Sequence, residues 1–425
     1  MQIEFIIFLS MIIVFMVAAF LLKFPVSISM VLASITGALI GGQGIPVKHL
    51  VEGTFGYIDT ILVIATAMIF MKVVQESGAL NALNETIVRK FHDKKVVLLI
   101  LLMLIIMFPG MITGSSTAAV LSAGALVAPV LMVMGIPRDK TGAIIAIGGI
   151  LGMIAPPVNV PAMIIGGGID LPYVGFTIPL LLLTMPLAVF TVLFLGLKHV
   201  KGFDYEESIA SGVFQASEVK KGLLIYTPII IVLILMVTSK ALPGIMPDLG
   251  MPLIFIIGAF IGLFTGEKVK IFKSIKDAIN STLPVLGILM GVGMFIQVMT
   301  LTGVRGFIVI NALSMPSVLL YLSIAMAMPL FGAVSSFGSA SVLGVPFVLA
   351  LLGQNEIITA SALSLIAGLG DLMPPTALAG IFAAQVVGEE NYFVVMKKCL
   401  IPALAILVFG LLFVIFARPI ASVIF

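Results

Sequence analysis

The chain has 425 residues, of which 61% are hydrophobic and only 10% are charged, with a formal net charge of +3. Soluble domains are typically about 25% charged and less than half apolar, so this composition excludes a soluble globular protein and predicts an all-α integral membrane protein. The charge indicates no nucleic-acid partner. A single cysteine, Cys399, excludes an internal disulfide and a thiolate metal cluster.

The first half of the chain, residues 1–198, is expected to alternate simple spans with two unusual segments. Simple spans of about 20 apolar residues fit 3–22, 25–42, 56–76 and 172–197. The first run lacks a basic leader and a small-residue cleavage site, so we expect it to be a retained span. Residues 96–134 are too long for one crossing and predict a re-entrant hairpin. Residues 141–169 are interrupted by two prolines and predict a broken helix.

A polar segment, 199–221, is expected to be a cytoplasmic linker to the second half, residues 222–425. Simple spans there fit 222–239, 249–266, 279–300 and 399–417. A second hairpin is expected at 306–352, and a second broken helix at 357–387. Two segments with basic and apolar residues at helical spacing, 79–95 and 267–279, predict interfacial helices, with charged loops as the alternative.

The two halves align with one constant offset and without a gap across their central part. The aligned pairs include Gly114 with Gly332, Gly152 with Gly370, Pro156 with Pro374, and Pro157 with Pro375. A repeated Pro-Pro in register with glycines predicts an internal duplication. If each hairpin returns to the side that it entered, each half has five crossings. The second copy must then be inverted, as in many secondary transporters.

The basic residues support this topology, because short cytoplasmic loops collect Lys and Arg. With both termini outside, the inner loops contain Lys23, Arg89, Lys90, Lys94, Lys95, Arg138, Lys140, Lys198, Lys201, Lys220, Lys221, Lys268, Lys270, Lys273, Lys276, Lys397 and Lys398. The outer side contains only Lys48, Lys240, Arg305 and Arg418. Lys72 falls within a span and is expected to extend toward its inner end.

The hairpin tips read GMITGSSTA at 110–118 and FGAVSSFGSAS at 331–341. Polar backbone at membrane depth is tolerated only where it is buried in protein or lines a cavity. Each diproline must also break its helix, which leaves free carbonyls before the break and a new helix N-terminus after it. Carbonyl and hydroxyl oxygens suit a hard cation such as Na⁺, and helix N-termini suit an anion. Pro and Gly breaks also serve helix packing, which is the alternative for any single motif. The occurrence of two tips and two diproline breaks as an inverted pair favours a binding site for an ion and a solute.

The candidate site residues follow from these motifs and from the one carboxylate that we place deep in a span. That carboxylate, Asp371, is expected to be a cation ligand or a proton carrier, with a carboxylate satisfied by neighbouring amides as the alternative. Asn159 is the best side-chain ligand of the first half. The expected cation ligands are Gly114, Ser115, Asn159, Gly332, Ser339 and Asp371. The expected solute contacts are Ser116, Thr117, Pro157, Ser335, Ser336, Pro375 and Thr376.

The stretch GSSTAAVLSAGALVAPVLMVMGIPRDKTGAIIAIGGILGMIAPPVN, with its later copy ending LMPPTALAG, resembles the large membrane subunit of tripartite ATP-independent periplasmic (TRAP) transporters, within the ion transporter superfamily. The resemblance implies a bacterial inner-membrane transporter with an elevator mechanism, Na⁺ as the coupling ion and no cofactor. The implied solute is an organic acid, such as a C4-dicarboxylate or sialic acid. The implied partners are a small four-helix membrane subunit and a periplasmic substrate-binding protein.

Three alternatives are weighed against this prediction. A stand-alone Na⁺/dicarboxylate symporter or exchanger of the same superfamily would use the same motifs without partners. A channel would need a continuous polar pore, which paired breaks do not indicate. An intramembrane serine hydrolase would need a base, and no His or Lys is expected at the right depth. We therefore expect a transporter and not an enzyme.

Overall fold

The computed structural model describes residues 3–200, 222–241, 247, 249–351, 353–374 and 376–425, and within them it is helical throughout, without strands. The first half contains α1 (Ile3–Met16), a π-helical turn (Val17–Leu21), α2 (Val26–Ile40), α3 (Val47–Phe55), α4 (Ile58–Glu76), α5 (Ala79–Phe91), α6 (Lys95–Thr113), α7 (Ser116–Ala119), a π-helical turn (Val120–Gly124), α8 (Ala125–Val133), α9 (Arg138–Ile154), α10 (Val160–Gly168) and α11 (Thr177–Gly196).

The second half begins with a 3₁₀ turn (Gly222–Tyr226) and continues with α13 (Thr227–Ala241), α14 (Gly250–Thr265), α15 (Ile271–Leu301), α16 (Val304–Leu313), α17 (Ser317–Gly332), α18 (Ser336–Ser339), a π-helical turn (Ala340–Gly344), α19 (Val345–Ala350), α20 (Glu356–Gly368), a 3₁₀ turn (Leu369–Leu372), α21 (Leu378–Val387), α22 (Tyr392–Ile415) and α23 (Ala417–Ile424). Eight helices of the described chain are long and apolar enough to cross a membrane. The expected all-α membrane fold is confirmed.

Both diprolines interrupt their helices, as proline chemistry requires. In the first half α9 ends at Ile154 and α10 begins at Val160, with the side chain of Asn159 accepting a hydrogen bond from the Ala162 amide at 2.8 Å as an N-cap. In the second half α20 ends at Gly368, and after a 3₁₀ turn the chain resumes as α21 at Leu378.

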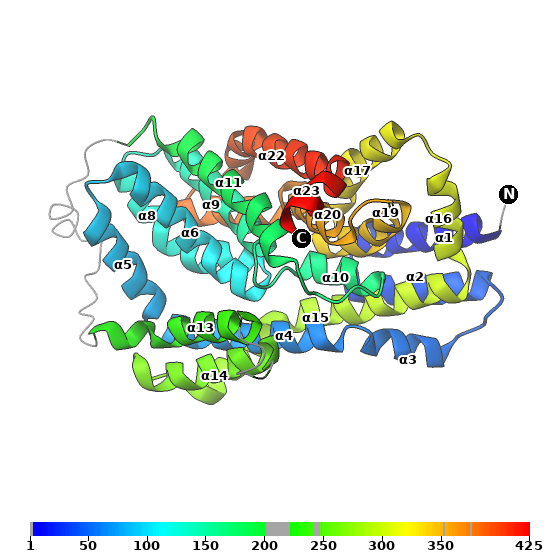
Figure 1. Cartoon of the computed structure of the whole chain (residues 1–425), viewed down its shortest axis with the longest axis horizontal. Helices are drawn as coiled ribbons and strands as arrows, with labels where there is room; N and C mark the ends of the chain where they lie inside the picture. Colours follow the sequence, from blue (N-terminus) through cyan, green and yellow to red (C-terminus); the bar gives the residue numbers. More distant parts are fainter. Residues whose placement is uncertain (1–2, 201–221, 242–246, 248, 352, 375) are drawn as a thin grey trace.

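Most of the helices fall into two groups. In Figure 1 the helices α3, α4, α13, α14 and α15 run along one side, and α6 to α11 and α17 to α22 lie on the other. The long helix α15 packs along α2, α3 and α4, while the buried helix α9 packs against α6, α11, α21 and α22. We call the first group, with α1 and α2, the scaffold group, and the second the core group.

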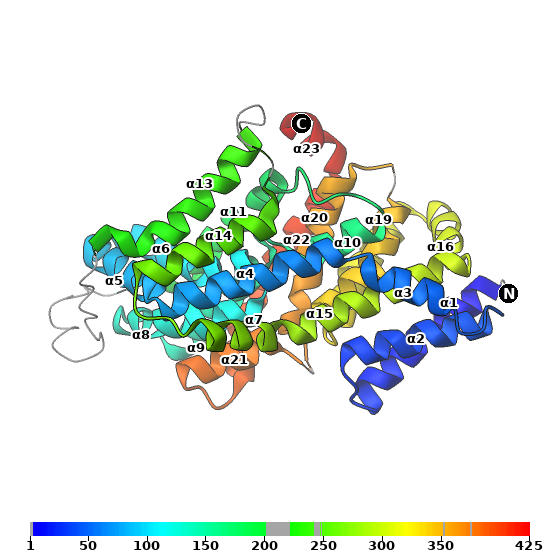
Figure 2. The same ribbon diagram turned by 90° about the horizontal axis from the view of Figure 1, so that it is seen from below.

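The two predicted hairpins approach the middle of the core group from opposite ends. Figures 1 and 2 show α6 and α8 at one end of the long axis, and α17 and α19 toward the other. In each, one helix ends at a glycine-containing tip and a second begins within a few residues: α6 gives way to α7, and α17 to α18. The short helices α7 and α18 continue through π-helical turns into α8 and α19, so each tip starts a helical run, Ser116–Val133 and Ser336–Ala350.

Several helix boundaries differ from expectation. The segment 267–279 is not a separate interfacial helix, because from Ile271 it is the first part of α15, which continues to Leu301. Short helices α3, α16 and α23 occupy stretches that were expected to be loops or parts of neighbouring elements.

The constant offset between the halves also holds only in part. It correctly pairs the first residue of α9, Arg138, with the first residue of α20, Glu356. At the tips it is wrong, because it pairs Ser116, where α7 begins, with Val334, whereas α18 begins at Ser336. The structural repeat therefore changes register between the tips and the broken helices.

Candidate functional site

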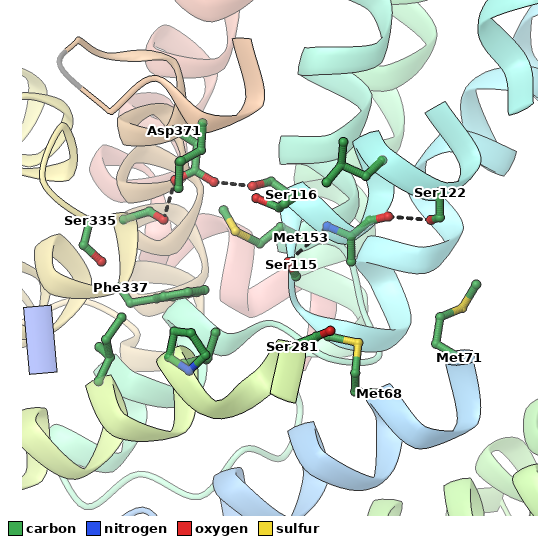
Figure 3. A pocket seen from close by; sticks show the side chains of 18 of the residues that line it. Met68, Met71, Ser115, Ser116, Ser122, Met153, Ser281, Ser335, Phe337 and Asp371 are labelled. Carbon is green, nitrogen blue, oxygen red and sulfur yellow. Dashed lines mark hydrogen bonds between the residues drawn. The ribbon is translucent and has the colours of Figure 1, made fainter. Parts of the chain in front are cut away.

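The two hairpin tips meet beside a cavity of about 510 Å³, which we call the central cavity (Figure 3). Its walls come from both tips, from the second broken helix, and from α4 and α15 of the scaffold group. Seven of the predicted site residues line it: Ser115, Ser116, Thr117, Ser335, Ser336, Asp371 and Thr376. The cavity therefore lies between the core group and the scaffold group.

Each tip is shaped by a serine that caps the helix after it. Ser115 has extended backbone, and its hydroxyl accepts a hydrogen bond from the Ala118 amide at 3.2 Å. Ser335 does the same with the Gly338 amide at 3.1 Å. A serine N-cap accepts a hydrogen bond from one of the unpaired amides at the start of a helix. The sequences Gly-Ser-Ser and Val-Ser-Ser can therefore end one helix and start the next inside an apolar stretch. The following serines, Ser116 and Ser336, then lie at the first turn.

Asp371 joins the two tips. Its carboxylate is 6% exposed and accepts hydrogen bonds from the hydroxyls of both Ser116 and Ser336, the latter at 2.8 Å. Asp371 lies in the 3₁₀ turn just before the second diproline, where the helical ladder is interrupted. A carboxylate buried in this way is costly unless it is hydrogen-bonded, and here one hydroxyl from each half of the chain meets that need. The register that pairs the two diprolines places Met153 opposite Asp371 in the first half, and Met153 also lines the cavity.

Glycine pairs bring each tip against its broken helix. A Cβ on Gly370 would lie 2.4 Å from backbone atoms of Gly332, so only two glycines allow this approach of α17 to the turn that carries Asp371. The first half has the same kind of contact, because a Cβ on Gly152 would lie 2.5 Å from the Met107 carbonyl oxygen of α6. The predicted cation ligand Gly332 is thus a packing residue at the end of α17.

The remaining predicted ligands of the first half do not reach the cavity. Asn159 is fully buried and its amide is fully used, donating to the Ile154 carbonyl at 2.8 Å and to the Ser364 hydroxyl at 2.9 Å while capping α10. Gly114 ends α6 with a positive φ of 64°. Pro157 lines a second, largely apolar cavity of about 550 Å³ together with Met111 and Tyr173.

In the second half, Ser339 is buried and donates to the Met328 carbonyl oxygen at 2.7 Å, so it ties α18 to α17. Thr376 lines the central cavity and donates to the Ala333 carbonyl oxygen at 2.7 Å, which links the second broken helix to the second tip. Pro375 lies outside the described residues.

The scaffold side of the cavity was not predicted. Met68, Met71, Lys72 and Gln75 of α4 line it at helical spacing, and α15 adds Ser281. The spacing i, i+3, i+4, i+7 places these four residues on one face of α4. However, α4 is apolar around most of its circumference, so the sequence alone did not indicate that this face is turned toward the tips.

The donor set at the tips suits a monovalent hard cation. Each serine hydroxyl that donates to Asp371 keeps two acceptor lone pairs, so Ser116, Ser336 and the carboxylate offer several oxygens around one point. Among the described residues no group of three or more His, Cys, Asp or Glu side chains could hold a metal ion. Hydroxyl and carboxylate oxygens with a single negative charge are the ligands that a hard cation such as Na⁺ accepts.

Comparison with known proteins identifies the family of the chain. The model of the family described as "Tripartite ATP-independent periplasmic transporter, DctM component" matches residues 12–420. The chain belongs to this family. It is therefore a membrane transporter component, and the predicted resemblance to TRAP transporters is confirmed. Comparison with curated protein sequences gives no match.

Two solved structures share the fold of this DctM-family chain. The YdaH transporter of Alcanivorax borkumensis, described as having an unusual topology, is 18% identical, with a TM-score of 0.59 over 86% of each chain. MtrF of Neisseria gonorrhoeae, described among antimetabolite efflux pumps, is 14% identical, with a TM-score of 0.57 over 87% of this chain and 83% of its own. At these identities the likeness concerns the fold alone.

Proposed function

We propose that this DctM-family chain is the large permease subunit of a secondary active transporter that imports an organic acid together with Na⁺. The observation that carries the proposal is the meeting of both tips at one buried carboxylate beside a cavity, with one hydroxyl from each half bonded to Asp371. Because each half supplies one hydroxyl, a cation bound at Asp371 would favour one arrangement of both tips beside the cavity, and this would link cation binding to solute binding there.

In this proposal the cation is held at Asp371 by the carboxylate and by the hydroxyls of Ser116 and Ser336. The solute lies in the adjacent cavity, against the tip residues Ser115 and Ser335. The amide ends of the two helical runs that start at the tips favour an anion, and a bound cation adds positive charge beside it. The bound cation and the organic anion then stabilise each other, so each strengthens the binding of the other.

Alternating access in this proposal is an elevator movement. The core group, with both tips and both broken helices, slides against the scaffold group of α1 to α4 and α13 to α15. Residues of both groups line the cavity, so displacement of one group against the other would carry the tips and Asp371 away from α4 and α15. The glycine contacts within the core group keep each tip with its broken helix during that movement.

The proposed partners and membrane follow from the family, and the proposed orientation follows from the basic loops. A DctM component works with a small membrane subunit and a periplasmic substrate-binding protein, and we propose both as partners, in a bacterial inner membrane. We propose that the loops rich in Lys and Arg lie in the cytoplasm and that both termini lie on the outer side. The alternative is a stand-alone Na⁺/dicarboxylate symporter or exchanger with the same site.

The test is uptake by reconstituted protein. Liposomes containing the chain, with or without the small subunit and binding protein encoded beside it, are supplied with a panel of radiolabelled organic acids. We expect accumulation only with an inward Na⁺ gradient and all partners present. Accumulation by the chain alone would favour the stand-alone alternative. Downhill flux without dependence on a Na⁺ gradient would refute coupled transport.

A further inference from the structure

Lys72 is the cationic side chain that lines the central cavity within the part of the chain that the structure describes, and Asp371 is the acidic one. They come from different groups of helices: Lys72 from α4 in the scaffold group, and Asp371 from the broken helix in the core group. The cavity thus has a negative group on its core wall and a positive group on its scaffold wall.

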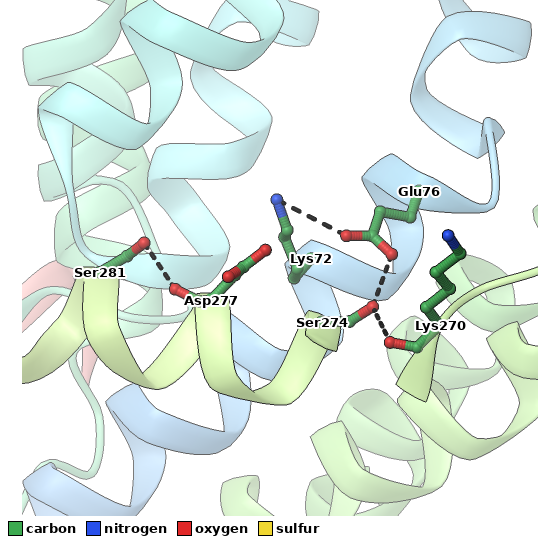
Figure 4. Close-up of polar contacts among 6 residues, drawn as sticks. All are labelled: Lys72, Glu76, Lys270, Ser274, Asp277 and Ser281. Carbon is green, nitrogen blue, oxygen red and sulfur yellow. Dashed lines mark hydrogen bonds and ion pairs between the residues drawn. The ribbon is translucent and has the colours of Figure 1, made fainter. Parts of the chain in front are cut away.

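Lys72 is held in place by a chain of contacts that leads away from the cavity. Its Nζ lies 3.6 Å from Oε1 of Glu76, one turn further along α4. The other oxygen, Oε2 of Glu76, accepts a hydrogen bond of 2.5 Å from the hydroxyl of Ser274 on α15 (Figure 4). Ser274 is 1% exposed, and Glu76 does not line the cavity. The acid is therefore fixed at the α4–α15 contact, while the amine faces the cavity.

This arrangement leaves Lys72 able to bind a ligand. At 3.6 Å the contact with Glu76 is an ion pair and not a hydrogen bond, since N–H···O bonds are usually 2.7–3.2 Å long. The ammonium has three N–H donors, which remain available within the described structure. Its side chain is 32% exposed, so a dissolved anion can reach it. Asp277 of α15 also faces Lys72 (Figure 4), and its negative charge limits the net positive charge around the Lys72 ammonium.

We propose that Lys72 is a specificity-determining residue that binds a carboxylate of the transported acid from the scaffold side, which rests on the proposed function. The acid is then held between a cation bound at Asp371 and the ammonium of Lys72, so charges alternate across the cavity. Glu76 and Ser274 are positioning residues for Lys72. Since α4 belongs to the scaffold group, this contact exists only while the cavity faces α4 and α15, and it is lost when the core group moves.

The test measures equilibrium binding of radiolabelled succinate to the purified full chain in Na⁺ buffer, with malate and N-acetylneuraminate run in parallel. Lys72→Gln is expected to weaken binding of the acid by about tenfold. This is the loss of affinity expected when one charge-assisted hydrogen bond is removed from a partly hydrated site. Lys72→Arg should retain binding. Lys270→Gln is the matched control, because it removes the same charge from an exposed position nearby that does not line the cavity.

A chemical rescue separates a role of the charge from a role in folding. The chain has one cysteine, the buried Cys399, so Cys399→Ala with Lys72→Cys gives a single reactive thiol. Aminoethyl methanethiosulfonate, which restores a positive group of similar length, should restore binding, whereas methyl methanethiosulfonate should not. The Cys399→Ala variant alone serves as the reference.

Three results would overturn the proposal: unchanged binding in Lys72→Gln, equal rescue by the methyl reagent, or a loss that aminoethylation does not reverse. These results differ from a failure of the proposed function, which would appear as no Na⁺-dependent binding of any acid by the unmodified chain.

Discussion

The contact between Gly332 and Gly370 predicts a large effect for a single added methyl group. In Gly370→Ala the new Cβ would lie 2.4 Å from three backbone atoms of Gly332, whereas ordinary contacts begin at 3.4 Å. Neither partner is a flexible side chain, so α17 and the turn must separate by about 1 Å, because close-packed interiors transmit such strain rather than absorb it. Overpacking of this kind costs about 1–3 kcal/mol.

The displacement acts directly on the site, because Asp371 follows Gly370 and its bond to Ser336 on the second tip is 2.8 Å long. A contact lengthened beyond about 3.5 Å is no longer a hydrogen bond, and hydrogen bonds to charged groups contribute about 1.5–3 kcal/mol. We expect Gly370→Ala to raise the Na⁺ concentration for half-maximal uptake by about tenfold or more, measured in proteoliposomes.

Gly306→Ala is the control for this variant, because a Cβ there meets no atom within 4 Å and alanine favours a helix over glycine. It should transport like the unmodified chain. If Gly370→Ala also showed unmodified Na⁺ dependence and unmodified thermal stability, the argument that close backbone contact positions Asp371 would be refuted.

Two other variants separate residues at the site from residues that hold the fold. Ser116→Ala removes a hydroxyl bonded to Asp371 and should raise the half-saturating Na⁺ concentration in uptake assays by about tenfold. Ser122→Ala should not, because Ser122 lines the same cavity but its hydroxyl donates to the Ala118 carbonyl oxygen one turn earlier and not to Asp371. Equal effects of the two variants would contradict the site. Asn159→Ala removes a helix cap and two donated hydrogen bonds, so chemical denaturation should show a loss of about 1–3 kcal/mol with unchanged Na⁺ dependence. A changed Na⁺ dependence at full stability would return Asn159 to the cation site.

The segments that could be predicted are those that local chemistry determines. An apolar run of about 20 residues has few alternatives to a helix, and two prolines must end one, so the helices and both breaks fall close to the expected positions. The second tip and Asp371 could be predicted to belong to one site, because the repeat indicates that each half contributes one hairpin tip and one broken helix to that site. The large membrane subunit fold follows from these features together.

What could not be predicted depends on contacts between distant segments. Asn159 was a reasonable ligand by position, but its amide is consumed by Ile154 and by Ser364, which is far away along the chain. The face of α4 that carries Lys72 is set by packing of α4 against α14, α15 and α6. The change of register at the tips was missed because the offset set by the diprolines pairs Gly114 with Gly332, although it leaves the serine pairs 115–116 and 335–336 out of register.

The most direct test of the account compares Na⁺ binding by the purified chain and by Asp371→Asn, which keeps the side-chain shape and removes the negative charge. Thermal unfolding is followed while Na⁺ replaces choline at constant ionic strength. A ligand that binds only the folded state raises its stability in proportion to the logarithm of its concentration above Kd. The account predicts that Na⁺ stabilises the unmodified chain and has no such effect on Asp371→Asn. Equal stabilisation of both proteins would contradict it.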